Sequence, residues 1–358
     1  MSLVIDADAH VVEGAAFALE ALARWPDRVK LERTPDGTPH FRIEGRRYPE
    51  SSGPGAGCPP QHGLTPAARD PHSPAGVLAD ADREGIDRMV LFPSLGLGVG
   101  GLEDAAFAAE FARLYNRFIA DYCRKGEGRL FGAATVPLQD VDAAIEILRE
   151  ARDTGLVCAT IPPALRTRNL DHPALDRFYA AAAELDLPLG VHGAPGVHLP
   201  QIGVDRFSNY VQVHCVSFPF DQMAALTALL SGGVFDRHPR LRVAFLEAGA
   251  TWVPYFLDRL HEHWEKRGDW IPNGWRRDPR EYVARGNVWV SCEPGETLLP
   301  AVVGALGADF LLYASDYPHW DSEFPESARA LRERTDLSAE ARAKILGGNA
   351  QRLFGIRA

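Results

Sequence analysis

The sequence predicts a (β/α)8 barrel. Short apolar runs that are typical of buried strands alternate along the chain with stretches of helical periodicity. Eight such pairs in one chain of 358 residues favour a closed barrel over an open doubly wound sheet. No glycine-rich dinucleotide-binding fingerprint follows the first strand, which weakens the open-sheet alternative further.

The strand signal comes from apolar runs that are nearly continuous, as expected for strands covered on both faces. The first strand lies within residues 3–13, and the others are expected at 88–93, 130–137, 156–162, 187–193, 241–248, 287–292 and 309–316. Helices are expected between them, among others at 104–124, 141–154, 173–185, 220–235 and 253–266. We expect residues 1–358 to form a single domain.

Residues 12–75 interrupt this rhythm. Two strand-like runs, 29–34 and 40–44, flank Pro35-Asp36-Gly37 and predict a β-hairpin. Residues 51–76 are dense in Gly, Pro and Ser, and long irregular segments inside a compact domain usually form lids or binding loops. We therefore expect residues 12–75 to form an inserted hairpin and loop that covers the mouth of the barrel.

Composition excludes several classes of partner. A net charge of −10 argues against binding to nucleic acid or to an anionic membrane, which would require a basic surface. No apolar run reaches the roughly 18 residues of a membrane span, and no signal peptide is recognisable. The five scattered cysteines indicate reduced thiols in a cytoplasmic protein. We expect a small-molecule substrate, and we leave a homodimer open.

The first strand carries the strongest functional signal, because Asp6, Asp8 and His10 are set one residue apart. Strict alternation would place all three on the inner face and the intervening apolar residues on the other. Buried acids and imidazoles are costly to desolvate unless they are paired or bind a cation. A polar cluster satisfied by hydrogen bonds is one interpretation, and a metal site is the other.

The metal interpretation gains support because similar residues recur where later strands end, the edge at which barrel enzymes place their chemistry. Imidazoles and carboxylates in this mixture suit Zn, Mn or Fe, whereas clustered thiols for a structural zinc site are absent. The candidate metal ligands are Asp8, His10, Glu13, His192, His214, Glu247, Asp316 and His319. Glu247, Asp316 and His214 are the candidate catalytic residues, and His319 could instead orient Asp316.

Five motifs resemble the amidohydrolase superfamily, and most closely its aminocarboxymuconate-semialdehyde decarboxylase-like branch. They are IDADAH (5–10), VHGAPG (191–196), the run 218–249 ending in FLEAG, YASDYPHWDSEFP (313–325) and GNAQRLFGI (348–356). The resemblance covers nearly the whole chain and implies the same barrel with a metal site.

The resemblance also assigns individual positions. It implies that Asp8 and His10 match the paired first-strand ligands, usually His-x-His, that His192 matches the fifth-strand ligand, and that Asp316 matches the eighth-strand Asp. Two departures stand out, because Asp8 replaces a histidine and Glu247 stands where the decarboxylases usually have one. The fourth strand also lacks the lysine that bridges two metals in binuclear members of the superfamily.

Three functions remain open. The carboxylate-rich ligand set favours a non-heme di-iron oxygenase, with two Fe(II) ions, that hydroxylates an apolar organic acid or its ester. The first alternative is a mononuclear Zn or Mn enzyme that acts as a hydrolase, or as a non-oxidative decarboxylase of an aromatic or unsaturated carboxylic acid. The second alternative is a non-catalytic binder of a small molecule. The requirement for dioxygen separates the first two.

Overall fold

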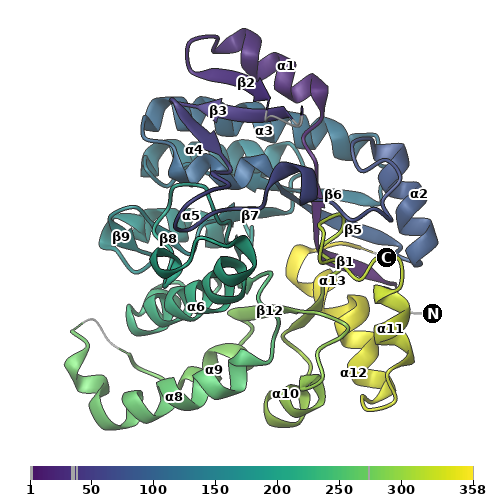
Figure 1. Ribbon diagram of the computed structural model, residues 1–358. Coiled ribbons are helices and arrows are strands. Elements are labelled where there is room, and N and C mark those ends of the chain that lie inside the picture. Colours follow the sequence, from purple (N-terminus) through teal and green to yellow (C-terminus); the bar gives the residue numbers. More distant parts are fainter. Residues whose placement is uncertain (1–2, 34–36, 38, 273–274, 358) are drawn as a thin grey trace.

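Eight parallel strands form the sheet at the centre of the molecule, as the sequence predicts (Figure 1). The computed structural model describes residues 3–357 except 34–36, 38 and 273–274. In sheet order the strands are β1 (Ile5–Val11), β5 (Arg88–Pro93), β6 (Leu130–Thr135), β7 (Cys158–Ile161), β10 (Leu189–Val191), β11 (Val243–Phe245), β12 (Val288–Cys292) and β13 (Leu311–Tyr313). The first and last strands meet through hydrogen bonds from Asp316 N to Asp8 O (3.0 Å) and from His10 N to Tyr317 O (2.6 Å). The predicted barrel is confirmed.

Helices follow the strands and cover the sheet (Figure 1). Asp104 and Asp140 accept backbone N–H groups at the first turns of α3 and α4, which fixes where these two helices begin. The helices are α2 (Pro74–Glu84), α3 (Ala105–Arg124), α4 (Val141–Asp153), α5 (Asp176–Glu184), α6 (Tyr210–Ser231), α7 (Val234–Arg237), α8 (Trp252–Arg267), α9 (Pro279–Ala284), α10 (Leu299–Leu306), α11 (Ser327–Glu333), α12 (Ala339–Ala343) and α13 (Asn349–Phe354).

Helix α6 differs from its prediction. It begins at Tyr210, ten residues before the expected start, so His214 lies on the helix and not ahead of it. The helix also contains Pro219. Among the described residues, α6 is also the one helix long and apolar enough to cross a membrane, with a mean hydropathy of 1.2. Because 56% of that stretch is buried within the fold, a core helix accounts for the same composition.

The barrel interior corrects one expectation about the first strand. Ile5 and Ala7 pack in one apolar cluster with Val90 and Leu246, whereas Ala9 and Val11 belong to a second cluster that includes residues of the surrounding helices. The reason is a register shift between Asp6 and Ala9 where β1 pairs with β5. Alternation is therefore broken inside β1, and the prediction that Asp6, Asp8 and His10 share one face is wrong for Asp6, which bonds Ser315, while Asp8 and His10 lie together.

Residues 12–75 form α1 (Ala15–Arg24) and a three-stranded antiparallel sheet of β2 (Val29–Arg33), β3 (Pro39–Ile43) and β4 (Arg46–Tyr48). The expected turn 35–37 lies mostly outside the described residues. Phe17 of α1 packs edge-to-face against Phe111 of α3, with the ring centres 5.8 Å apart. Figure 1 shows this purple segment at one end of the molecule. The loop that follows pairs Leu64 with His319. That these residues are an insertion into a single domain stays a prediction.

Candidate active site

Three of the expected ligands converge at the mouth of the barrel. The Nε2 atoms of His10 and His192 lie 3.2 Å apart, and Asp8 Oδ1 lies 4.0 and 3.7 Å from them. All three side chains are at least 98% buried. Phe92 lies beneath the pair, 5.8 Å from the ring of His192, and Gly190 leaves room for it because a Cβ there would lie 2.7 Å from the Phe92 ring.

Backbone carbonyls orient both imidazoles. His10 Nδ1 donates to Pro93 O at 2.9 Å, and His192 Nδ1 donates to Gly193 O at 2.7 Å. With their Nδ1 atoms bonded in this way, both rings turn Nε2 toward the other ring. A proton or a metal ion between the two nitrogens avoids repulsion of their lone pairs, and such carbonyl contacts are how proteins orient metal-binding histidines. The pair fits a cation.

Asp8 gives an independent reason for a cation. Neither of its carboxylate oxygens has a hydrogen-bond partner among the described residues, and the side chain is 1% exposed. Burial raises the pKa of Asp8 to about 7, and the nearby charge of His192 limits the rise. An ionised carboxylate in this position is stable only with a cation beside it.

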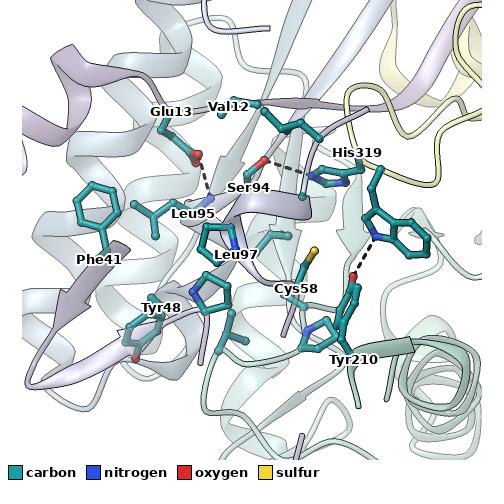
Figure 2. A pocket seen from close by; sticks show the side chains of 18 of the residues that line it. Val12, Glu13, Phe41, Tyr48, Cys58, Ser94, Leu95, Leu97, Tyr210 and His319 are labelled. Atoms are coloured by element: carbon teal, nitrogen blue, oxygen red, sulfur yellow. Dashed lines mark hydrogen bonds between the residues drawn. The ribbon is translucent and has the colours of Figure 1, made fainter. Parts of the chain in front are cut away.

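Asp316 and His319 complete the cluster from the loop after β13. Asp316 Oδ1 lies 3.4 Å from His10 Nε2 and 2.8 Å from His319 Nδ1, while His319 Nε2 lies 3.4 Å from Ser94 Oγ (Figure 2). Asp316 has a φ of 54°, in the left-handed region that residues other than glycine seldom adopt and that is often found at functional sites. Burial, with the charge of Glu247, raises the pKa of Asp316 well above its ordinary value.

Glu247 lies at the edge of this cluster and faces the cavity. Its φ of 55° is also in the left-handed region, and its Oε2 lies 3.0 Å from His192 Nε2. Its other oxygen lies 3.9 Å from His214 Nε2, and Asp321 Oδ2 lies 3.7 Å from the same nitrogen. Burial opposes ionisation, but the charge of His192 holds the pKa of Glu247 below its ordinary value.

The pKa values of the two histidines beside Glu247, His192 and His214, are raised, whereas that of Glu247 is lowered. Burial lowers the pKa of each, yet the Glu247 carboxylate outweighs burial and raises the pKa of His192 to about 9 and that of His214 above its ordinary range. The cluster therefore attracts positive charge. His214 also packs between aromatic rings, with Phe218 4.4 Å and Trp320 5.9 Å away.

Two acidic residues of the first strand region lie apart from the cluster. Both carboxylate oxygens of Glu13 accept backbone amides, from Leu95 (2.9 Å) and Gly96 (3.0 Å), at the start of a 3-10 turn. Asp6 accepts hydrogen bonds from the backbone N–H and the hydroxyl of Ser315 and from Asp8 N. Asp6 thus supports the backbone of Asp8 and of the eighth-strand loop.

A cavity of about 520 Å³ opens above the cluster, with Glu247 and His319 in its wall. Its lining is mostly apolar and comes from distant segments, including Phe41, Leu95 and Tyr210 (Figure 2). Trp320 Nε1 donates to the hydroxyl of Tyr210 at 3.4 Å.

Sequence reasoning missed Glu293, although it directly follows β12 and so has the position of the other candidates. Burial and the neighbouring carboxylates raise its pKa to about 7.

A model of the amidohydrolase family matches residues 5–356. The chain belongs to this family. It is 26% identical over 251 residues to 2-amino-3-carboxymuconate-6-semialdehyde decarboxylase of Dictyostelium discoideum, covering 70% of this chain and 67% of that one. It is 29% identical over 294 residues to a gamma-resorcylate decarboxylase of a Rhizobium species, and the match covers 76% of this chain and 84% of that one. A dihydroxybenzoic acid decarboxylase structure from a Polaromonas species, with bound manganese and 2-nitroresorcinol, superposes with a TM-score of 0.70 at 21% identity, covering 100% and 98%.

These relatives confirm the resemblance to the decarboxylase branch, and they correct the main functional hypothesis. The expected di-iron oxygenase is wrong, because the relatives are decarboxylases, and the favoured pair of iron ions has no support among them. The hypothesis relied on a count of carboxylates, and that count included Glu13, whose oxygens are held by backbone amides. The cytoplasmic location and the homodimer stay predictions.

Proposed function

We propose that this protein is a metal-dependent, non-oxidative decarboxylase of an aromatic carboxylic acid. The observation that carries the proposal is the buried cluster of Asp8, His10 and His192, whose geometry fits a divalent cation at the floor of an apolar cavity. The decarboxylases related to this chain support the choice of reaction.

In the proposed site, the ligands are Asp8, His10, His192 and Asp316. Two imidazoles and two carboxylates suit Mn²⁺ or Zn²⁺, and the Polaromonas structure holds manganese. A divalent ion held by these residues would supply a Lewis acid for the carboxylate of the substrate. His319, through its contact with Asp316 at 2.8 Å, positions that ligand.

Decarboxylation also needs a proton, because the carbon that loses CO2 must gain hydrogen. His214 is the proposed acid. It lies between Phe218 and Trp320 near the cavity, and the Glu247 carboxylate at 3.9 Å favours its protonated form. The Glu247–His214 pair would then donate the proton, the role we assign to the strand-six histidine that the related decarboxylases usually have. The aromatic rings around His214 suit a flat substrate.

Anaerobic assay of the Mn²⁺-loaded protein with a panel of hydroxybenzoic acids and unsaturated acids tests the proposal. We expect release of CO2 together with the corresponding product in which hydrogen replaces the carboxyl group. His214→Gln should lower kcat by about 10²- to 10⁴-fold with the metal retained, since general acid catalysis contributes that much. His263→Gln is the control, because His263 is exposed on α8. Hydrolysis of an ester or amide without CO2 would favour a hydrolase instead.

A further inference from the structure

Asp321 is a charged residue of the cavity wall that the proposed reaction does not use. It lies on the loop after β13 and lines the cavity, and its side chain is 30% exposed, so a ligand can reach it. Its Oδ2 atom lies 3.7 Å from His214 Nε2, beyond hydrogen-bond distance. Within the described part of the chain, no Lys or Arg forms an ion pair with Asp321. Its carboxylate is therefore open to a ligand.

A row of contacts places Asp321 relative to the metal cluster. Glu247 Oε2 lies 3.0 Å from Nε2 of His192, a proposed ligand, and Glu247 Oε1 lies 3.9 Å from His214 Nε2. Asp321 comes next in this row, on the same nitrogen of His214. An aromatic acid whose carboxylate lies at the cluster would thus have Asp321 on one side of its ring, within reach of a ring substituent.

The rest of the cavity wall does not neutralise this charge. Among the described residues that line the cavity, the acids are Glu13, Glu247 and Asp321, and none is Lys or Arg. Glu13 is held by backbone amides, and Glu247 lies between the imidazoles of His192 and His214. Most of the remaining lining is apolar (Figure 2). A second carboxylate on the ring would meet Asp321 without a cation beside it, whereas a basic substituent would be attracted.

We propose that Asp321 is a specificity-determining residue, which disfavours a second anionic group on the substrate and favours a cationic one. The substrate class is then an aromatic acid with a single carboxylate, whose other substituents are neutral or basic. This substrate assignment rests on the proposed function, whereas the selection by charge can be measured as binding without any turnover.

Ligands of one shape and three charges test the proposal. Benzoates that carry a carboxylate, a carboxamide or an amidine at the same ring position differ in the charge of a planar group of similar size. Series at the ortho, meta and para positions vary the direction in which this group points. Calorimetric titration of the Mn²⁺-loaded protein at low salt gives the affinities, corrected for the two equivalent carboxylates of the diacid. In the series that reaches Asp321, the amidine should bind about 5- to 20-fold more tightly than the diacid, with the amide between them, because the carboxylate is partly exposed and screened by water.

Two variants show whether Asp321 causes this order. Asp321→Asn keeps the size of the side chain and removes its charge, so the ratio of amidine to diacid affinity should fall to about 3-fold or less. Asp153→Asn is the matched control, because it removes the same charge from an exposed residue at the end of α4, and it should leave the ratio unchanged. About 0.5 M NaCl should reduce the ratio of the wild type, since salt screens an exposed charge.

A comparison in the His214→Gln background separates a direct effect of Asp321 from one transmitted by the neighbouring imidazole. Asp321→Asn should lower the ratio there as well, and no effect in that background would overturn the proposal. The proposal is also overturned if the wild type binds the diacid as tightly as the amide at every ring position, or if Asp321→Asn keeps the full ratio. Selection by charge without CO2 release from any acid would refute only the proposed decarboxylation.

Discussion

Replacing Asp8 by Asn should have opposite effects on stability with and without metal. The Asp8 carboxylate is 1% exposed and has no partner among the described residues, so in the metal-free protein its ionisation opposes folding. Its pKa is raised to about 7 from the ordinary value of 3.8. At about 1.36 kcal/mol per pKa unit, this difference corresponds to about 4 kcal/mol of unfolding free energy.

The sign follows from proton linkage. Because folding raises the pKa of Asp8, the folded state binds the proton more tightly, and the resulting stabilisation is complete below about pH 4. It is lost progressively as the pH rises to about 7. At pH 8 the metal-free Asp8→Asn variant, which cannot ionise, should therefore be more stable than the wild type. Since the buried amide also needs a partner, we expect a net gain of about 1–3 kcal/mol.

With metal the order should reverse, because the variant loses a charged ligand and a large part of the stabilisation that bound metal provides. Urea unfolding at pH 8, once with a chelator and once with saturating Mn²⁺, measures both cases. Asp8→Asn should be the more stable protein with the chelator and the less stable one with Mn²⁺. A variant that is less stable than the wild type by the same amount in both conditions would refute a ligand role for Asp8.

Three further predictions address other residues. His192→Ala should remove bound metal, by elemental analysis, while circular dichroism shows a folded barrel; stoichiometric metal in the variant would refute its assignment as a ligand. Glu247→Gln should lower the pKa of His214 and move the alkaline limb of the kcat–pH profile down by about 1–2 pH units, and an unmoved limb in a metal-loaded variant would contradict the proposed pair. Asp221, 6% exposed on α6, has a pKa raised to about 6 by burial, so its stabilising effect is lost as the pH rises from about 4 to 6. Asp221→Asn should therefore gain up to about 3 kcal/mol relative to wild type in urea unfolding between pH 4 and pH 7, and a constant difference would count against this.

The barrel was predictable because its strands are covered on both faces and carry nearly continuous apolar runs. The run 88–93, for example, coincides with β5. The start of α6 could not be predicted, because a proline such as Pro219 normally marks a helix boundary. In the structure the helix begins at Tyr210 and continues past Pro219. The sequence also did not predict which side chains of β1 point into the barrel. A register shift between Asp6 and Ala9 changes this, and it leaves no trace in the alternation of residue types.

The candidate site divides in the same way. Asp8, His10, His192 and Asp316 were predictable as neighbours, because the carboxyl ends of all barrel strands meet at one mouth. The isolation of Glu13 was not, because its partners are backbone amides of Leu95 and Gly96, which no side-chain pattern reveals. The chemistry was predicted wrongly because ligand types alone do not distinguish oxidative from non-oxidative use of a metal.

We propose that the cluster of Asp8, His10, His192 and Asp316 holds one divalent ion, and that the protein with this ion bound releases CO2 without dioxygen. The most direct measurement is a titration of the metal-free protein with Mn²⁺ under anaerobic conditions, following labelled CO2 released from a carboxyl-labelled hydroxybenzoic acid. We predict no CO2 without metal and a rate that saturates at one ion per chain, unchanged when air is admitted. A rate that requires dioxygen, or metal-saturated protein that releases no CO2 from any acid tested, would contradict the proposed decarboxylation.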